Sequence, residues 1–268
     1  MTTPTDTCTP ALLDRLAAAE RLWLFLDYDG TLADFAATPE YVEPDPTVVG
    51  LVARLAASER IRVAVISGRR LDHVQKLLPV PGILLAGAYG VELQTPTGDR
   101  IDRVPYSTIR PTLDLIKPRW EKLIAGREGF FLEDKGWALA LHARFADDVT
   151  AQRVLVAANR IVSQTPSLKT GRFRLLGGHK FMEIGPSLGN KGLAVEYILE
   201  NAPWPDALPV YLGDDDKDEE AFRVVKGRGG VAIVIANAPR ESAADCRLAS
   251  PQAARWWLER VLARFEET

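Results

Sequence analysis

Residues 24–32 read Leu-Phe-Leu-Asp-Tyr-Asp-Gly-Thr-Leu, an apolar run that ends in two aspartates and a glycine turn. The run predicts a buried β-strand that stops at Asp27 and Asp29. Open α/β folds bind their ligands at the carboxyl ends of the strands, so both acids are expected at such an edge. Two carboxylates this close repel each other unless a cation or a shared proton holds them together. The stretch therefore predicts an α/β sheet with a metal site that offers a nucleophile and a proton donor.

The pattern on either side of this stretch is a repeated strand–helix alternation. Helical spacing at 11–21 and 46–58 alternates with apolar strands at 62–66 and 82–86. This rhythm predicts a Rossmann-like, doubly wound parallel sheet. The same rhythm resumes after residue 185 and continues to a terminal helix at 251–265.

Between these halves the pattern changes to helix, hairpin, helix and hairpin. Such an order predicts an α+β unit with an antiparallel sheet, inserted into the parallel domain. We therefore expect a core made of 11–103 and 185–268, a cap at 104–184 that selects the substrate, and a disordered tail at 1–10.

The composition is that of an ordinary globular protein and excludes several classes. The 268 residues carry a net charge of −3, which argues against a nucleic-acid groove, and no apolar run approaches the length of a membrane span. The N-terminus lacks the basic and apolar regions of a signal peptide.

Cys8 and Cys246 are expected to be unpaired, which indicates a reducing compartment and a cytoplasmic protein. No heptad or basic patch indicates a macromolecular partner, so a monomer is favoured.

The two aspartates of the first strand are candidate catalytic residues. Asp27 is the candidate nucleophile, because a carboxylate can attack phosphorus and split one displacement into two easier steps. Asp29 is the candidate general acid and base, which protonates the leaving oxygen and later activates water. Without the other motifs, the pair could also be read as acidic loop residues after a strand.

Two further segments offer groups that suit a phosphate. Ser67 and Gly68 follow the strand at 62–66 and precede a helix, where a hydroxyl, an amide and a helix N-terminus can hold an anion. Lys191 opens the helix that follows the insertion and can offset negative charge on a phosphoryl group. By itself, a Ser-Gly pair is also common as an ordinary strand-to-helix turn. A lone lysine at a helix start is usually exposed to solvent. Arg69 could equally be a solvated side chain.

A second acidic cluster follows the apolar strand at 210–212. Magnesium prefers oxygen ligands and is commonly held by one or two carboxylates together with phosphate and water. Asp214 is the expected direct ligand, beside Asp27 and the backbone carbonyl of Asp29. Asp215 and Asp218 are expected to act through water or by orienting neighbours, whereas Glu219 and Glu220 fit a solvated helix start.

In their order along the chain, these motifs resemble the signature set of the haloacid dehalogenase superfamily. A closer resemblance, over nearly the whole chain, is to the trehalose-6-phosphate phosphatases. It is carried by residues 26–32 (LDYDGTL), 66–69 (ISGR), 85–90 (LAGAYG), 132–136 (LEDKG), 141–144 (LHAR), 183–186 (EIGP), 190–192 (NKG) and 212–215 (LGDD).

This resemblance implies a magnesium-dependent phosphatase of trehalose biosynthesis that acts on trehalose 6-phosphate. It also implies that Glu133, Lys135 and Glu183 of the cap contact the sugar. The chain departs from the usual family pattern where Tyr89 replaces His, Ala143 replaces Tyr, Gly185 replaces Lys and Lys217 replaces Thr. None of these changes touches the expected nucleophile, acid or main metal ligand, so they bear on the identity of the substrate.

The sequence thus predicts hydrolysis of a sugar phosphate through a phosphorylated Asp27, with Mg²⁺ as cofactor. Two alternatives remain open at this level. One is a phosphatase or phosphomutase for another sugar phosphate, which would share every catalytic residue. The other is a non-catalytic sugar-phosphate-binding protein in which the altered positions have removed activity.

Overall fold

The computed structural model describes residue 8, residues 10–34 and residues 43–266. Its internal contacts divide the chain into two compact units. Met1–Ile101 and Asn190–Thr268 form the larger unit, and Asp102–Gly189 form the smaller unit. The smaller unit is therefore a contiguous segment inserted between the two halves of the larger one.

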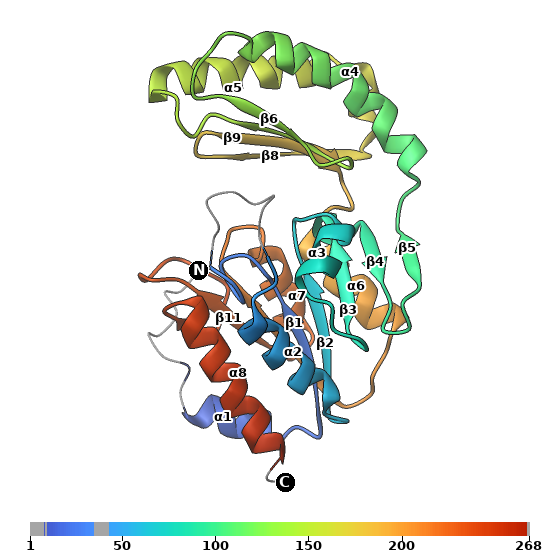
Figure 1. Ribbon diagram of the computed structural model, residues 1–268, viewed down its shortest axis with the longest axis vertical. Helices are drawn as coiled ribbons and strands as arrows, with labels where there is room; N and C mark the ends of the chain where they lie inside the picture. Colours follow the sequence, from blue (N-terminus) through green and yellow to red (C-terminus); the bar gives the residue numbers. More distant parts are fainter. Residues whose placement is uncertain (1–7, 9, 35–42, 267–268) are drawn as a thin grey trace. The chain divides into compact units, whose positions relative to one another are not determined.

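The larger unit is built on an eight-stranded sheet in the order β12-β11-β10-β1-β2-β3-β4-β5 (Figure 1). All neighbours from β12 to β3 are parallel, whereas β4 runs antiparallel to β3. This parallel core confirms the predicted α/β class. The strands are β1 (Arg21–Leu26), β2 (Ile61–Ile66), β3 (Leu84–Gly87), β4 (Glu92–Gln94), β5 (Arg100–Asp102), β10 (Ala207–Gly213), β11 (Val231–Ile235) and β12 (Cys246–Leu248).

Helices cover both faces of this sheet, and each face has its own cluster of buried hydrophobic side chains. On one face pack α1 (Pro10–Ala17), α2 (Pro46–Ala57), α3 (Leu71–Leu77) and α8 (Pro251–Glu266). On the other face pack α6 (Lys191–Asn201) and α7 (Glu219–Gly227). Because β1 is buried on both faces, it is almost wholly apolar, as parallel strands between two helical layers are.

The local sequence explains where α2 begins. The Asp45 carboxylate accepts a hydrogen bond from the Thr47 amide at 2.8 Å, and Pro46 occupies the first helical position of α2. Val48, Leu51, Val52 and Leu55 then recur on one face of α2 and are buried against the sheet.

The smaller unit packs two helices, α4 (Tyr106–Ile124) and α5 (Asp148–Ser163), with a four-stranded antiparallel sheet. The sheet order is β6-β7-β9-β8, with β6 (Phe131–Asp134), β7 (Leu139–His142), β8 (Phe173–Gly178) and β9 (Phe181–Pro186). Ile109, Leu113, Ile116 and Trp120 bury one face of α4 although the helix contains Pro111 and Pro118. Short 3₁₀ turns lie at Ala88–Gly90 (η2) and Pro166–Thr170 (η3).

One prediction about the cysteines is wrong. Cys8 and Cys246 form a disulfide across a sequence separation of 238 residues. Cys246 is buried in β12, and Cys8 packs against the same core, so the fold brings two distant thiols together. The expectation of a reducing compartment rested on unpaired cysteines and loses that support, and the cytoplasmic location stays a prediction.

The remaining expectations for the N-terminus and the membrane are partly outside the described residues. Of the tail predicted at 1–10, residues 1–7 and 9 are not described, Cys8 is cross-linked and Pro10 begins α1. Among the described residues, every helix is too short or too polar to cross a membrane.

Candidate active site

Asp27 and Asp29 lie directly beyond the carboxyl end of β1, the strand at the centre of the sheet. The Asp27 amide still donates to the Leu212 carbonyl of β10 at 2.9 Å, and the chain then leaves the ladder. Gly30 has a left-handed backbone with φ of 80°, and its amide donates to the Ala33 carbonyl at 2.7 Å. This turn ends the strand and leaves the two carboxylates at the sheet edge.

Lys191, the first residue of α6, links two of the acidic segments. Its ammonium donates to Asp27 Oδ1 at 2.7 Å and to Asp218 Oδ1 at 2.6 Å. All three side chains are at most 5% exposed. The lysine is therefore a buried cation shared between the candidate nucleophile and the loop that follows β10.

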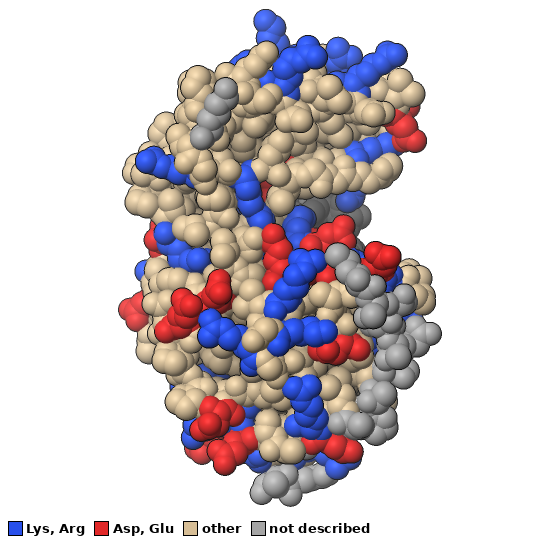
Figure 2. Space-filling model, turned by 180° about the vertical axis from the view of Figure 1, so that it is seen from behind, with Lys and Arg blue, Asp and Glu red and all other residues tan. Residues whose placement is uncertain are grey.

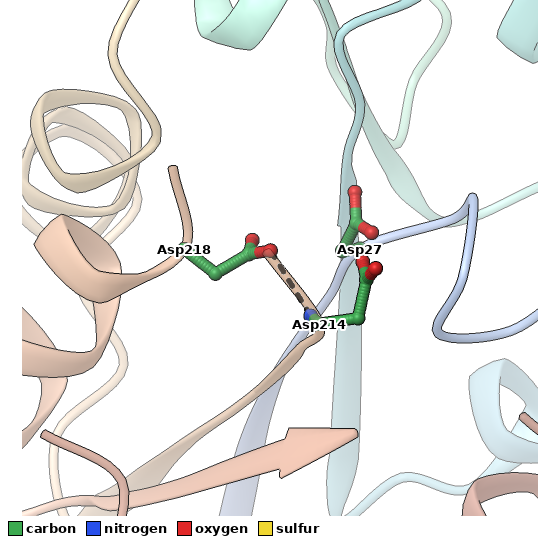
Figure 3. A group of neighbouring side chains, drawn as sticks. All are labelled: Asp27, Asp214 and Asp218. Atoms are coloured by element: carbon green, nitrogen blue, oxygen red, sulfur yellow. Dashed lines mark hydrogen bonds between the residues drawn. The ribbon is translucent and has the colours of Figure 1, made fainter. Parts of the chain in front are cut away.

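Asp214 brings a third carboxylate to the same place from the end of β10 (Figure 3). One oxygen from each of Asp27, Asp214 and Asp218 lies within 4.8 Å of the others. Three carboxylates around one lysine leave an excess of negative charge, and oxygen donors suit a hard divalent cation. The donor set therefore fits Mg²⁺.

Hydrogen bonds distinguish Asp218 from the other two acids. Its Oδ1 accepts from Lys191 and from the Tyr211 hydroxyl at 2.7 Å. Its Oδ2 accepts from the amides of Asp214 and Asp215 at 3.1 and 3.0 Å. Direct ligation by Asp218 would compete with these donors, so its geometry suits a residue that shapes the loop beside the metal.

The pKa shifts at the site follow from burial and from the crowding of negative charge. Burial raises the pKa of Asp27 well above its usual range, with Lys191 opposing the shift and Asp218 and Asp214 adding to it. Burial, together with Asp218 and Asp215, raises the pKa of Asp214 to about 7. Burial lowers the pKa of Lys191, but Asp218 and Asp27 outweigh it and hold that pKa well above its usual value.

The predicted phosphate-binding turn follows β2. Ser67 is fully buried, and its hydroxyl accepts from the Arg69 amide at 3.1 Å. The next residue, Gly68, lies under the ring of Tyr89, where a Cβ would come within 2.7 Å of ring atoms. Arg69 is not a solvated side chain, because its guanidinium forms an ion pair with Asp29.

Three residues that sequence reasoning did not assign also shape the site. The Thr31 hydroxyl lies 3.2 Å from Asp27 Oδ2 and 3.5 Å from Asp214 Oδ1. Tyr211 supports Asp218, and Arg240 donates to the Asp214 carbonyl at 2.8 Å. Thr31 and Tyr211 adjoin motifs that were recognised, whereas nothing in the sequence around Arg240 indicates this contact.

The structure brings the three predicted sugar-contacting residues together on one face of the smaller unit's sheet. Glu133 and Glu183 both pair in register with Ala140, whose small side chain leaves room between them. Lys135 Nζ lies 2.7 Å from Glu183 and 3.9 Å from Glu133. His142 Nε2 lies 3.0 Å from Glu133, and the His142 ring stacks on Phe131.

The charged side chains on the surface do not form one basic tract on the face that Figure 2 shows. Acidic and basic residues are interspersed over the described part of the larger unit there. Such a surface offers no extended groove for a nucleic-acid backbone on that face.

Sequence comparison identifies a known family. The trehalose-phosphatase family model matches residues 25–252. The maize trehalose 6-phosphate phosphatase RA3 is 29% identical over 265 residues, covering 92% of this chain and 72% of that protein. Trehalose-phosphate phosphatase B of Arabidopsis thaliana is 28% identical over 263 residues, covering 92% and 67% respectively. The chain spans about two thirds to four fifths of the length of such relatives.

Solved structures show the same fold. The C-terminal domain of the Candida albicans trehalose-6-phosphate phosphatase superposes with a TM-score of 0.83 at 19% identity, covering 98% of both chains. The Aspergillus fumigatus trehalose-6-phosphate phosphatase gives a TM-score of 0.71 at 23% identity over the full length of both. With the family model matched from β1 to α8, the chain belongs to the trehalose-phosphatase family.

Proposed function

We propose that the protein is a Mg²⁺-dependent phosphatase that hydrolyses trehalose 6-phosphate to trehalose and phosphate. The observation that carries this proposal is the buried Asp27–Lys191–Asp218 network with Asp214 beside it. The network combines a nucleophilic carboxylate, a fixed cation and ligands for a metal. The substrate is taken from the similar trehalose-phosphate phosphatases.

In the first step, an oxygen of Asp27 attacks phosphorus while the bond from phosphorus to the sugar oxygen breaks. Asp29 gives its proton to the leaving sugar oxygen. Ser67, the Gly68 amide and Lys191 hold the phosphoryl oxygens as the charge on them changes. In the second step, Asp29 takes a proton from water, and that water attacks the phosphorylated Asp27 and releases inorganic phosphate.

We assign the metal to Asp27, the backbone carbonyl of Asp29 and Asp214, with Asp215 and Asp218 holding the surrounding loop. Bound there, Mg²⁺ offsets negative charge on the carboxylates and on the phosphate. Glu133, Lys135 and Glu183 are proposed to bind the sugar hydroxyls, which can both donate and accept hydrogen bonds. In this proposal the smaller unit is the cap that selects the sugar and excludes water during transfer.

The test is phosphate release from trehalose 6-phosphate, sucrose 6-phosphate and glucose 6-phosphate, each with MgCl₂ and with EDTA. We expect a strong preference for the trehalose ester and loss of activity in EDTA. The Asp27→Asn variant should lose more than about 1,000-fold in turnover while it stays folded. Retained turnover in this variant would remove the nucleophile assignment.

The other outcomes of the same experiment discriminate the alternatives. Preference for another ester would keep the mechanism and change the substrate. A requirement for a bisphosphate activator, without net phosphate release, would indicate a phosphomutase. Thermal stabilisation by the sugar phosphate without any turnover would indicate a binding protein.

A further inference from the structure

The segment before β4 has an unusual backbone. Ala88 and Tyr89 have φ of 49° and 57°, in the left-handed region that residues other than glycine rarely adopt. Their amides donate to the Arg69 and Ser67 carbonyls at 2.7 and 2.8 Å. Strained backbone persists where its surroundings determine it strongly, and it occurs preferentially at functional sites. Here the two hydrogen bonds hold Tyr89 against the turn that follows β2.

The Tyr89 side chain fills the space above Gly68. A Cβ at Gly68 would lie 2.7 Å from two ring carbons of Tyr89 and 2.8 Å from its hydroxyl oxygen. Tyr89 as a whole is only 8% exposed, so little of the residue is in contact with solvent. Tyr89 therefore restricts the position of the Ser67–Gly68 turn from one side.

Lys217 connects the same ring to the acidic loop. Its ammonium lies 5.5 Å from the centre of the Tyr89 ring and 3.3 Å from Asp215 Oδ2. An ammonium over an aromatic face is attracted by the electrons of the ring. The turn after β2 and the loop after β10 are thus joined through Tyr89, Lys217 and Asp215.

These two residues are also the two positions in the larger unit that depart from the usual family pattern. Asn and His are enriched in left-handed backbone compared with other residues. The backbone at position 89 is therefore compatible with Asn or His, neither of which supplies the phenol ring of Tyr89.

We infer that Tyr89 and Lys217 are a coupled pair of positioning residues that sets the affinity of the Ser67–Gly68 turn for phosphate. Tyr89 holds the turn, and Lys217 acts on the turn by holding the Tyr89 ring. Loss of either member releases the same contact, so their effects should not add. This inference rests on the proposed function, because it assumes that the turn binds a phosphate group.

The experiment measures the dissociation constant of inorganic phosphate in MgCl₂ by titration calorimetry, without turnover. Tyr89→Asn removes the ring without adding backbone strain, and Lys217→Met removes the charge at similar length. Each substitution should raise the dissociation constant roughly 3- to 10-fold. The dissociation constant of the double variant should not exceed that of the single variant that binds phosphate more weakly. Lys76→Met, at an exposed lysine of α3, is the control for charge and should leave binding unchanged.

Steady-state kinetics and conservative variants separate positioning from a purely structural role. KM for the sugar phosphate should rise with phosphate affinity, while kcat changes by less than about 2-fold. Tyr89→Phe and Lys217→Arg keep the ring and the cation, and each should retain wild-type phosphate binding.

The possible failures separate this inference from the proposed function. Multiplicative losses in the double variant, or unchanged phosphate binding in both single variants, would overturn the inference and leave the proposed function standing. Failure of Lys217→Arg to retain binding would also overturn it. A wild-type protein that does not bind phosphate with Mg²⁺ would overturn the proposed function and this inference with it.

Discussion

Arg69 holds Asp29 through both carboxylate oxygens, with Nε donating to Oδ2 at 2.7 Å and Nη2 donating to Oδ1 at 2.6 Å. Only 10% of the Arg69 side chain and 24% of the Asp29 side chain are exposed. Paired, nearly parallel hydrogen bonds of this kind fix direction as well as distance. The proposed general acid and base is therefore oriented by the same turn that is proposed to bind phosphate.

Replacement of Arg69 should impair the transfer of a proton to a poor leaving group. Lysine cannot form the paired contact, so Arg69→Lys should lower kcat for the sugar phosphate roughly 10- to 100-fold. The loss should be much smaller for p-nitrophenyl phosphate, whose leaving group needs no proton. Arg54→Lys, in an exposed pair with Glu259, is the matched control and should have no effect. Equal losses on both substrates would mean that Arg69 acts on the phosphate instead.

The raised pKa of Asp214 predicts a stability that depends on pH and on Mg²⁺ together. A carboxyl group with a pKa of about 7 in the folded protein and an ordinary pKa of 3.8 stabilises the fold below about pH 4. This contribution, up to roughly 4 kcal/mol, is lost as pH rises through 7. In the metal-free protein, this group therefore lowers the unfolding temperature between pH 5 and pH 7.5.

Magnesium should reverse this loss because it replaces the proton. We expect Mg²⁺ to raise the unfolding temperature at pH 7.5 and to have much less effect at pH 5, where protons compete with it. Thermal unfolding with MgCl₂ or EDTA at both pH values tests this, with ionic strength matched by KCl. The Asp214→Asn variant should lose the response. A magnesium shift that is the same at both pH values would contradict the prediction.

Asp218 is expected to matter for stability more than any exposed acid of its loop. Asp218→Ala removes an acceptor from Lys191, Tyr211 and two backbone amides inside the protein. Breaking a buried ion pair on one side costs about 3–5 kcal/mol. Asp216→Ala, at a side chain that is 95% exposed, should cost less than about 1 kcal/mol. Urea unfolding compares them, and similar costs would show that the buried network contributes little.

The Cys8–Cys246 disulfide should stabilise the larger unit by restricting the unfolded chain. For a loop of 238 residues, the chain-entropy argument gives an upper limit on the order of 5 kcal/mol. Reduction should therefore lower the unfolding temperature, and Cys8→Ser should reproduce the effect and abolish the response to the reductant. Mass spectrometry of the unreduced protein reports the bond directly. An unfolding temperature that does not change on reduction would refute the prediction.

The parallel core could be predicted because its signals are local. β1 is an uninterrupted apolar run, and Asp27 follows it immediately, so residue types and spacing suffice. In contrast, β12 has only three residues, one of which is the charged Arg247, and no local pattern indicated it. Its pairing with β11 and its link to Cys8 depend on the assembled fold.

The residues of the candidate site also fall into those that local sequence signals predict and those that depend on the assembled fold. Asp27, Asp214 and Lys191 follow or open predicted elements, and topology places such positions at one edge of a parallel sheet. The contact of Arg69 with Asp29 depends on a side-chain conformation, and the contact of Arg240 with the Asp214 carbonyl joins residues from separate loops. Neither contact leaves a periodic pattern in the sequence.

The insertion of a contiguous unit also has a consequence for the order of synthesis. In the centre of the sheet, Phe25 of β1 pairs with Tyr211 of β10, 186 residues further along the chain. All residues of the smaller unit are synthesised, and leave the ribosome, before those of β10, so that unit can fold while β1 still lacks one of its neighbours. The ladder that aligns Asp27 with Asp214 is therefore a late, long-range event. A nascent chain that ends before β10 carries Asp27 and Lys191 but lacks Asp214 and Asp218, the two carboxylates that lie beside them in the folded protein.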